Sequence, residues 1–154
     1  MTLRVYTVND IVVTTRNFHL TLASILRKRA QHIRFQSEKL LMEYLADREQ
    51  GIADLLYVVE DDEDALKLGN WVEDYFQEKS VLSKDINRVL ENCENSVQVR
   101  EVVSNIYNDL QDMYEFVLYK ADTEPAHETV ESILALYKFV GKRPSFVSQV
   151  AVNG

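Results

Sequence analysis

The chain is poor in the residues that cross-link or interrupt small proteins. Its 154 residues include one cysteine, Cys93, together with two prolines and four glycines. A single cysteine excludes an intrachain disulfide and a cysteine-rich metal site, and it agrees with a reducing compartment. So few glycines and prolines favour a small number of long helices over many strands joined by turns. The length suits one domain with a sizeable buried core.

Positive charge and long apolar runs are also scarce. Lys and Arg number 17 against 25 Asp and Glu, and the net charge of −8 argues against binding to nucleic acid. The one basic cluster, Arg27–Arg29, fills a single helical turn, and we interpret it as a solvated face. No segment is long and apolar enough to span a bilayer or to act as a signal peptide, so we expect no membrane contact and a cytoplasmic location.

Apolar residues recur at helical spacing, which predicts an all-α fold. The predicted long helices cover residues 10–31, 37–60, 96–121 and 125–140. Asp10 and Ser37 are the predicted N-caps of the first two. The third helix carries the clearest apolar seam, formed by Val99, Val103, Ile106, Leu110, Met113 and Val117. Gly51 weakens the second helix by about 1 kcal/mol relative to Ala and is small enough to allow close approach of a neighbour.

The remaining segments are shorter or less regular. Residues 2–8 fit a short helical turn, an extended arm or a loop. Residues 61–95 form a crossover that contains amphipathic pieces at 65–77 and 84–93. Its opening acids lack the alternating ligands and central glycine of a calcium loop, so we interpret them as capping acids at a helix junction. Residues 142–154 form a C-terminal tail.

Two helical segments, residues 41–52 and 130–141, look like copies of one another. Each centres on a Leu-Ala step, Leu45-Ala46 in the first and Leu134-Ala135 in the second. With the helix order and the long middle crossover, they make residues 10–141 resemble the ferritin-like superfamily, in particular the rubrerythrin-type bundles. The resemblance implies a four-helix bundle with a long helical crossover between helices 2 and 3, built around a di-iron site.

Most ligands of such a site are missing from this chain. The resemblance implies one Glu from each of two helices and a Glu-x-x-His from each of the other two. Glu49 matches a ligand position, but Ile52 stands where the His is expected, and Lys138 and Gly141 occupy the matching pair on the fourth helix. Residues 11–37 contain no Asp or Glu. One ligand cannot hold or neutralise two divalent ions, so we predict no metal centre and no cofactor.

Two interpretations fit the space that the missing ligands leave, namely a polar cluster or plain hydrophobic packing. If Arg48 points inward it needs a carboxylate, which Glu49 can supply, and Tyr137 and Lys138 can join from the facing helix. The alternative is that Arg48 and Lys138 extend to water. His19 is offset by one position from the apolar stripe, so we predict it on the flank of the first helix.

The two other histidines have ordinary explanations. Glu124 and His127 spell Glu-x-x-His, but they lie at a helix start, where a carboxylate interacts favourably with the exposed amides. A peripheral surface metal site there is the alternative. His32 falls in the bend after the first helix, where a capping or surface role is expected.

The sequence therefore predicts a non-catalytic helical protein with a structural, regulatory or protein-interaction role. Its predicted partner is a second copy of the chain or an unidentified protein. Trp71, Tyr75 and Phe76 form the predicted interaction surface, unless they pack over the bundle as core.

Two alternatives stay open. The first is a metal-binding or oxidoreductase-type protein with an altered site that uses His19, Glu49, Glu128 and Glu131. The second is a protein that binds a small ligand between its helices. The chain has no glycine-rich phosphate loop, no nucleophile–base pairing and no zinc-protease motif.

Overall fold

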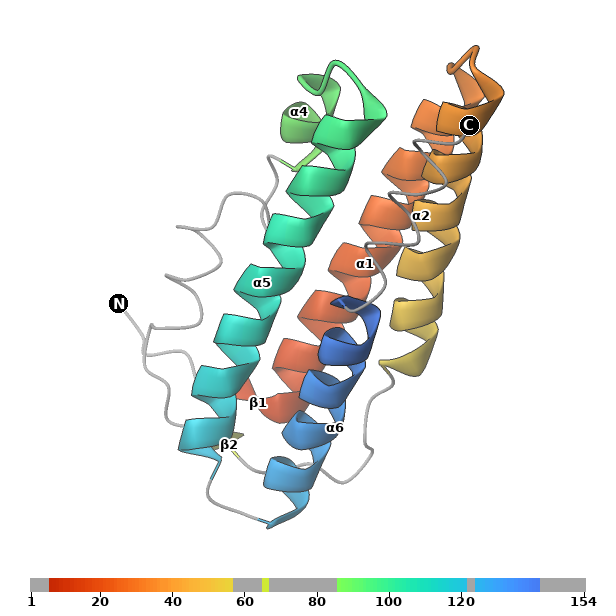
Figure 1. Ribbon diagram of the computed structural model, residues 1–154. Coiled ribbons are helices and arrows are strands. Elements are labelled where there is room, and N and C mark those ends of the chain that lie inside the picture. The colour runs from red at the N-terminus through yellow and green to blue at the C-terminus, as the bar shows by residue number, and fades with distance from the viewer. Residues whose placement is uncertain (1–5, 57–64, 67–85, 122–123, 142–154) are drawn as a thin grey trace.

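The computed structural model describes residues 6–56, 65–66, 86–121 and 124–141. Within these ranges the regular secondary structure is helical apart from one pair of two-residue strands, which confirms the all-α prediction (Figure 1). The helices are α1 (Val8–Gln31), α2 (Gln36–Leu55), α4 (Ile86–Glu91), α5 (Ser96–Lys120) and α6 (Glu124–Gly141). None of the helices in this described part is long and apolar enough to cross a membrane.

The two strands pair segments that are far apart in the sequence. β1 (Tyr6–Thr7) runs antiparallel to β2 (Ala65–Leu66), with Tyr6 opposite Leu66. Of the three conformations that the sequence allowed for residues 2–8, the extended arm is therefore the correct one for Tyr6–Thr7. The predicted helix from residue 65 is wrong for Ala65–Leu66, because their backbone groups are paired with the arm. Residues 67–77 of that piece lie outside the described residues.

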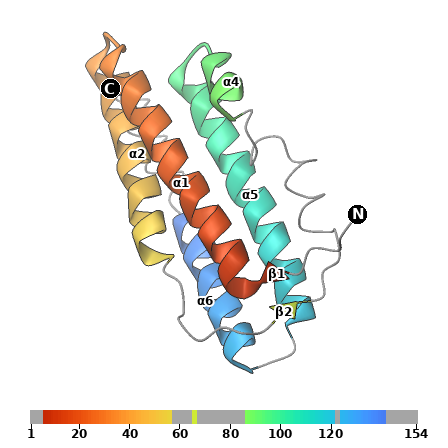
Figure 2. The same cartoon turned by 180° about the vertical axis from the view of Figure 1, so that it is seen from behind.

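The four long helices lie side by side around one core (Figures 1 and 2). α1 and α2 form one antiparallel pair, and α5 and α6 form the other. α2 descends toward the end of the molecule where β1 and β2 lie. α4 and the start of α5 lie at the opposite end, so α2 and α5 run in the same direction.

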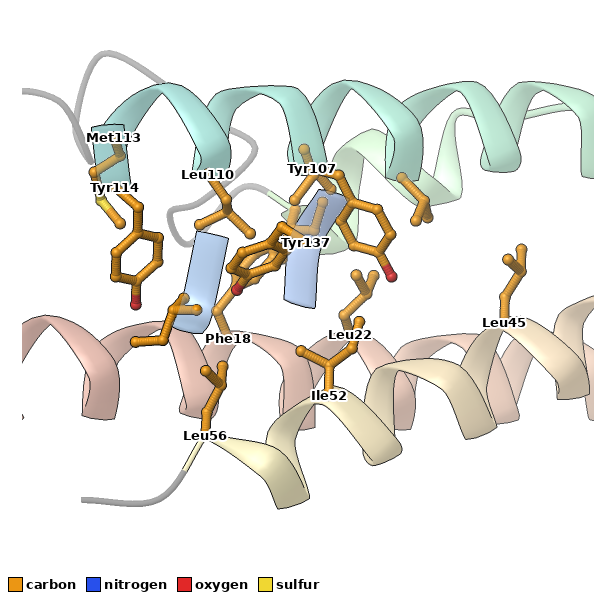
Figure 3. Close-up of a cluster of buried hydrophobic side chains, with 14 of the residues drawn as sticks. Phe18, Leu22, Leu45, Ile52, Leu56, Tyr107, Leu110, Met113, Tyr114 and Tyr137 are labelled. Carbon is orange, nitrogen blue, oxygen red and sulfur yellow. The ribbon is translucent and has the colours of Figure 1, made fainter. Parts of the chain in front are cut away.

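The core takes apolar side chains from all four long helices (Figure 3). Every residue of the predicted α5 seam is buried, which confirms the interpretation of that helix. Steps of three and four keep these residues on one face. Each buried Leu or Val side chain contributes about 1.5–3 kcal/mol to folding relative to exposure, so this seam is a large part of the driving force.

The predicted helix starts are wrong in two places. α1 begins at Val8, so Asp10 lies inside its first turn and is not the N-cap. The β-branched residues that follow are helical because several of them are buried, and packing outweighs local propensity. α2 begins at Gln36 with Phe35 in the N-cap position and no side-chain cap, so Ser37 is not the cap.

Arg29 of α1 joins the last turn of that helix to α4. Arg29 donates from its two terminal nitrogens to the carbonyl oxygens of Leu90 at 2.8 Å and Cys93 at 2.7 Å. These carbonyls lie at or just after the C-terminal end of α4, where a helix leaves acceptors without intrahelical partners. The predicted short helix at 84–93 is thus present over Ile86–Glu91 and fixed to the end of α1.

Gly51 offers a direct test of the α2 packing. A Cβ atom built on Gly51 meets no other atom within 4 Å, so the expected close approach of a neighbouring helix is wrong. Gly51→Ala should raise the free energy of unfolding by about 0.5–1 kcal/mol, because Ala favours the helix and restricts the unfolded chain. Urea unfolding at an unchanged m-value measures the gain. Ala135→Gly, at an exposed position in α6, should produce a loss of similar size; a destabilised Gly51→Ala protein would contradict the open space.

Candidate functional site

A carboxylate lies in the centre of the apolar core. Glu49 is on the inner face of α2, four residues after Leu45 and three before Ile52, and its side chain is fully buried. That spacing puts it on the same stripe as its apolar neighbours. A buried ionised carboxylate is strongly destabilising unless it is paired and hydrogen-bonded, so its partners decide whether this core is stable.

Glu49 receives hydrogen bonds from two other helices. The hydroxyl of Tyr107, on α5, donates to Oε1, and Nδ1 of His19, on α1, contacts Oε2. Both partners are buried with it. Because an ionised carboxylate can only accept, Nδ1 of His19 carries the hydrogen of the second bond.

The chain of hydrogen bonds continues through His19 to α6. Nε2 of His19 lies 2.7 Å from the hydroxyl oxygen of Tyr137, whose side chain is fully buried. A neutral imidazole with its hydrogen on Nδ1 accepts from Tyr137 at Nε2, whereas an imidazolium donates from Nε2 to the Tyr137 oxygen. The order is Tyr107, Glu49, His19, Tyr137, with one residue from each long helix. We call these four residues the buried quartet.

A second polar contact lies beside the buried quartet. Oγ1 of Thr15 is 2.6 Å from the hydroxyl oxygen of Tyr114, and both residues are fully buried. The Tyr114 ring stacks on that of Tyr137, with centroids 5.9 Å apart and planes 29° apart. Figure 3 shows Tyr107, Tyr114 and Tyr137 together in the space between α5 and α1. Each buried hydroxyl thus faces a polar partner, as stability in an apolar core requires.

Arg48 places positive charge at the edge of the buried quartet. It is half-buried, and its guanidinium carbon lies 4.8 Å from the centre of the Tyr107 ring. A cation over an aromatic ring is attracted by the ring's negative face. The same charge offsets the negative charge of Glu49 in the interior. Arg48 does point partly inward, but its guanidinium lies over Tyr107.

Burial raises the pKa of all three core tyrosines. For Tyr107 the loss of solvation raises the pKa most, the charge of Glu49 raises it further, and Arg48 opposes the shift. For Tyr137 desolvation is again the largest cause, followed by Tyr114 and Glu49. Desolvation also raises the pKa of Tyr114, against the effect of its hydrogen bond with Thr15, which lowers it. The three phenols therefore keep their hydrogens at neutral pH.

The structure corrects the prediction for His19. It lies in the core and not on the flank, because it is four residues after Thr15 and three before Leu22 on the inner face of α1. Of the two interpretations of the central space, the structure contains the polar cluster, with Tyr137 as a member. Lys138 is exposed and takes no part in it.

The residues of the alternative metal site do not come together. His19 and Glu49 are in the core, whereas Glu128 and Glu131 are exposed on α6. His127 forms a surface pair with Glu131, with Nδ1 and Oε1 3.2 Å apart. Among the described residues, no group of three or more His, Cys, Asp or Glu side chains is placed to hold a metal ion. Trp71, Tyr75 and Phe76 lie outside the described residues, so the interaction surface stays a prediction.

Sequence reasoning missed Thr15, Tyr107 and Tyr114. A signal for them was present, because the tyrosines are seven residues apart and each directly follows a seam residue of α5. A core-facing helix buries a stripe wide enough to include such adjacent positions. Thr15 and His19 are likewise one turn apart on α1.

A di-iron centre does not fit the residues in the core. Such a centre uses four carboxylates and two imidazoles, and two divalent ions carry four positive charges. The buried quartet supplies one carboxylate and one imidazole. Both nitrogens of that imidazole are directed to different partners, Glu49 and Tyr137. The donor set is therefore too small and too weakly charged to hold two buried ions.

Comparison with known proteins yields no family for this chain. No protein-family model, curated protein or solved structure matches it. The two Leu-Ala segments behind the ferritin-like resemblance are not equivalent in their packing, because Ala46 is buried whereas Ala135 is exposed. The resemblance to that superfamily stays a prediction.

Removal of the central carboxylate should be costly. Glu49→Ala leaves Tyr107 and His19 with buried polar atoms that have lost their partner, so we expect the free energy of unfolding to fall by about 3–5 kcal/mol. Glu43→Ala, at an exposed position on the same helix, should change it by less than about 0.5 kcal/mol. Chemical denaturation measures both, and equal effects of the two substitutions would contradict a central role for Glu49.

The raised pKa values of the core tyrosines predict a loss of stability at high pH. An unfolded chain releases phenol protons near its ordinary pKa of about 10, but the folded protein holds these three to higher pH. The stabilisation is therefore complete below about pH 10 and falls as pH rises above it. Phenolate absorbance and helical ellipticity, followed together, should show that these phenols ionise as the helices unfold.

Two substitutions test whether the buried tyrosines cause the loss of stability at high pH. Tyr137→Phe should remove one phenol from the ionisation that accompanies unfolding. Tyr119→Phe, at a position 81% exposed, should leave that ionisation unchanged. Full phenol ionisation while the ellipticity is still native would rule out the buried tyrosine arrangement.

Proposed function

We propose that this protein is a non-catalytic, ferritin-like helical module with a structural, regulatory or protein-interaction role. In it the buried quartet stands where relatives of that superfamily would hold two iron ions. The observation that carries the proposal is that Glu49 and His19, the two side chains best suited to bind metal in the core, are hydrogen-bonded to each other. The position is used to join helices.

The helix directions support the ferritin-like part of the proposal. α1 with α2 and α5 with α6 are antiparallel pairs, whereas α2 and α5 run in the same direction (Figure 1). α2 therefore ends toward one end of the bundle, whereas α5 begins at the other. One long crossover between the middle helices is the connectivity of ferritin-like bundles.

The burial of the quartet supports the non-catalytic part. A general acid or base has to come within hydrogen-bond reach of the group that it protonates or deprotonates. The four side chains of the quartet are at most 3% exposed. Their hydrogen bonds also join them to one another in an unbroken series. Such an arrangement stabilises a core and offers a substrate no contact with these groups.

One observation favours a second candidate, a protein that binds a single metal ion at an altered site. His19, Glu49 and Tyr107 come from three helices and meet at one point, as metal ligands do. An ion there would have to displace the hydrogens that now join these groups. It would also lie close to the positive charge of Arg48, which disfavours a second cation.

Metal titration distinguishes the two candidates. Metal-free protein is titrated with Fe²⁺ under anaerobic conditions and separately with Mn²⁺, while bound metal per chain and the Tm are measured. An ion that binds the native state and not the unfolded chain raises the Tm, and the rise grows with the logarithm of the free ion concentration above the Kd. We expect no saturable binding and no rise in Tm, because the quartet already satisfies its own donors and acceptors.

Glu49→Gln is the matched variant for this titration. It keeps the size of the side chain and removes the negative charge. Two ions per chain in the parent protein would overturn the proposal. One ion per chain that is lost in Glu49→Gln would replace it with the second candidate. Glu131→Gln, at an exposed position, shows whether any weak binding comes from the surface pair on α6 instead.

A further inference from the structure

A hollow of about 500 Å³ lies where the last turns of α1 meet α4. Lys28 and Arg29 of the last turn of α1 line it, together with His32 in the turn that follows the helix. The backbone amide of His32 donates to the carbonyl oxygen of Arg29 at 3.1 Å, which keeps His32 beside the end of the helix. The volume lies within the usual range for small-molecule sites, roughly 300–1,000 Å³.

Arg29 gives this hollow a positive charge in a fixed position. Its hydrogen bonds to the carbonyls of Leu90 and Cys93 hold the guanidinium in place. Both acceptors are neutral, so these bonds leave the charge of Arg29 uncompensated. A ligand that uses this charge does not have to immobilise the side chain, which lowers the entropic cost of binding.

The three residues of the basic cluster, Arg27–Arg29, do not share one solvated face as the sequence predicted. Arg27 points toward α2, where it contacts Asp47 at 3.3 Å and Gln50 at 3.3 Å. Lys28 and Arg29 line the hollow instead. Lys28 and His32 are exposed, so their side chains can turn toward a ligand. Arg27 therefore takes part in an ion pair with α2, whereas Lys28 and Arg29 line the cavity beside α4.

The remaining walls indicate what kind of anion would fit. Ile25, which is half-buried, provides apolar surface, and Asn87 provides a carboxamide. Among the described residues that line the hollow, Glu91 is the one acid, against the positive charges of Lys28 and Arg29. In a chain with a net charge of −8, an anion is repelled overall and needs such a local group of basic residues.

We infer that the hollow between α1 and α4 is a binding site for a small organic phosphate. A phosphate monoester carries about −1.5 to −2 charge at pH 7 and presents three acceptor oxygens, which matches several basic donors better than one carboxylate does. Its organic part would lie against Ile25. A second hollow of about 660 Å³ shares Ile25, Lys28 and Asn87, so larger organic groups have space to extend along α1. The inference is independent of the buried quartet, whose members do not line either hollow.

Phenyl phosphate is the probe for this site, with inorganic phosphate as the comparison. Calorimetry at low salt should give saturable binding of one phenyl phosphate per chain, and inorganic phosphate should bind more weakly because it leaves the apolar walls uncovered. Lys28→Glu should weaken phenyl phosphate binding by about tenfold or more, since it reverses a charge beside the anion. Lys120→Glu, at the end of α5, makes the same change of net charge and should alter the affinity less than twofold.

Three results would overturn the inference. They are the absence of saturable binding, equal weakening by Lys28→Glu and Lys120→Glu, and equal affinity for phenyl phosphate and inorganic phosphate. The second would mean that net charge alone governs the interaction. Both lysines are exposed, and an unchanged Tm of each variant shows that lost binding is not lost folding. Ile25→Ser supplies an independent variant that keeps every charge and should weaken only phenyl phosphate.

Discussion

The burial of one carboxylate determines how the four long helices can be arranged. Glu49 is stable in the core only if donors from other helices reach both of its oxygens, because an unpaired buried charge costs several kcal/mol. Tyr107 and His19 supply those donors. The hydroxyl of Tyr137 is hydrogen-bonded to the other ring nitrogen of His19. Since each member of the buried quartet stands on a different helix, a shift of any one helix along its axis breaks at least one bond. We therefore attribute the helix register to the quartet, and the bulk of the driving force to the apolar side chains around it.

This division of roles explains why the interior and the surface of the molecule differ in what they can do. In the core the polar groups of the quartet are joined to one another, and burial keeps the three phenols protonated. At the end of α1, by contrast, Arg29 donates its hydrogen bonds to neutral carbonyl oxygens. Its positive charge is therefore not neutralised and can attract an anion into the hollow beside α4. Among the described residues, the uncompensated charge at this hollow is therefore at the surface and not in the core.

Much of the fold could be predicted from the sequence, but little of the site. The buried face of α5 could be predicted because its apolar residues recur at steps of four and three without a polar interruption. The start of α1 could not be predicted from local preference, because packing of the helix against the core outweighs the strand preference of its first residues. His19 was misplaced because its position was judged against Phe18, whereas Thr15 and Leu22 define the face that is buried. The contact of Glu49 with Tyr107 joins residues 58 positions apart, and no local pattern reveals such a pair.

The tautomer of His19 is the most direct test of the central claim that hydrogen bonds, and not metal, occupy the core. A long-range ¹H–¹⁵N correlation spectrum of the imidazole distinguishes a protonated from an unprotonated ring nitrogen. The account predicts a slowly exchanging hydrogen on Nδ1, directed at Glu49, while Nε2 faces the hydroxyl of Tyr137. A spectrum in which Nδ1 carries no hydrogen, or in which the signals change when a chelator is added, would contradict the account.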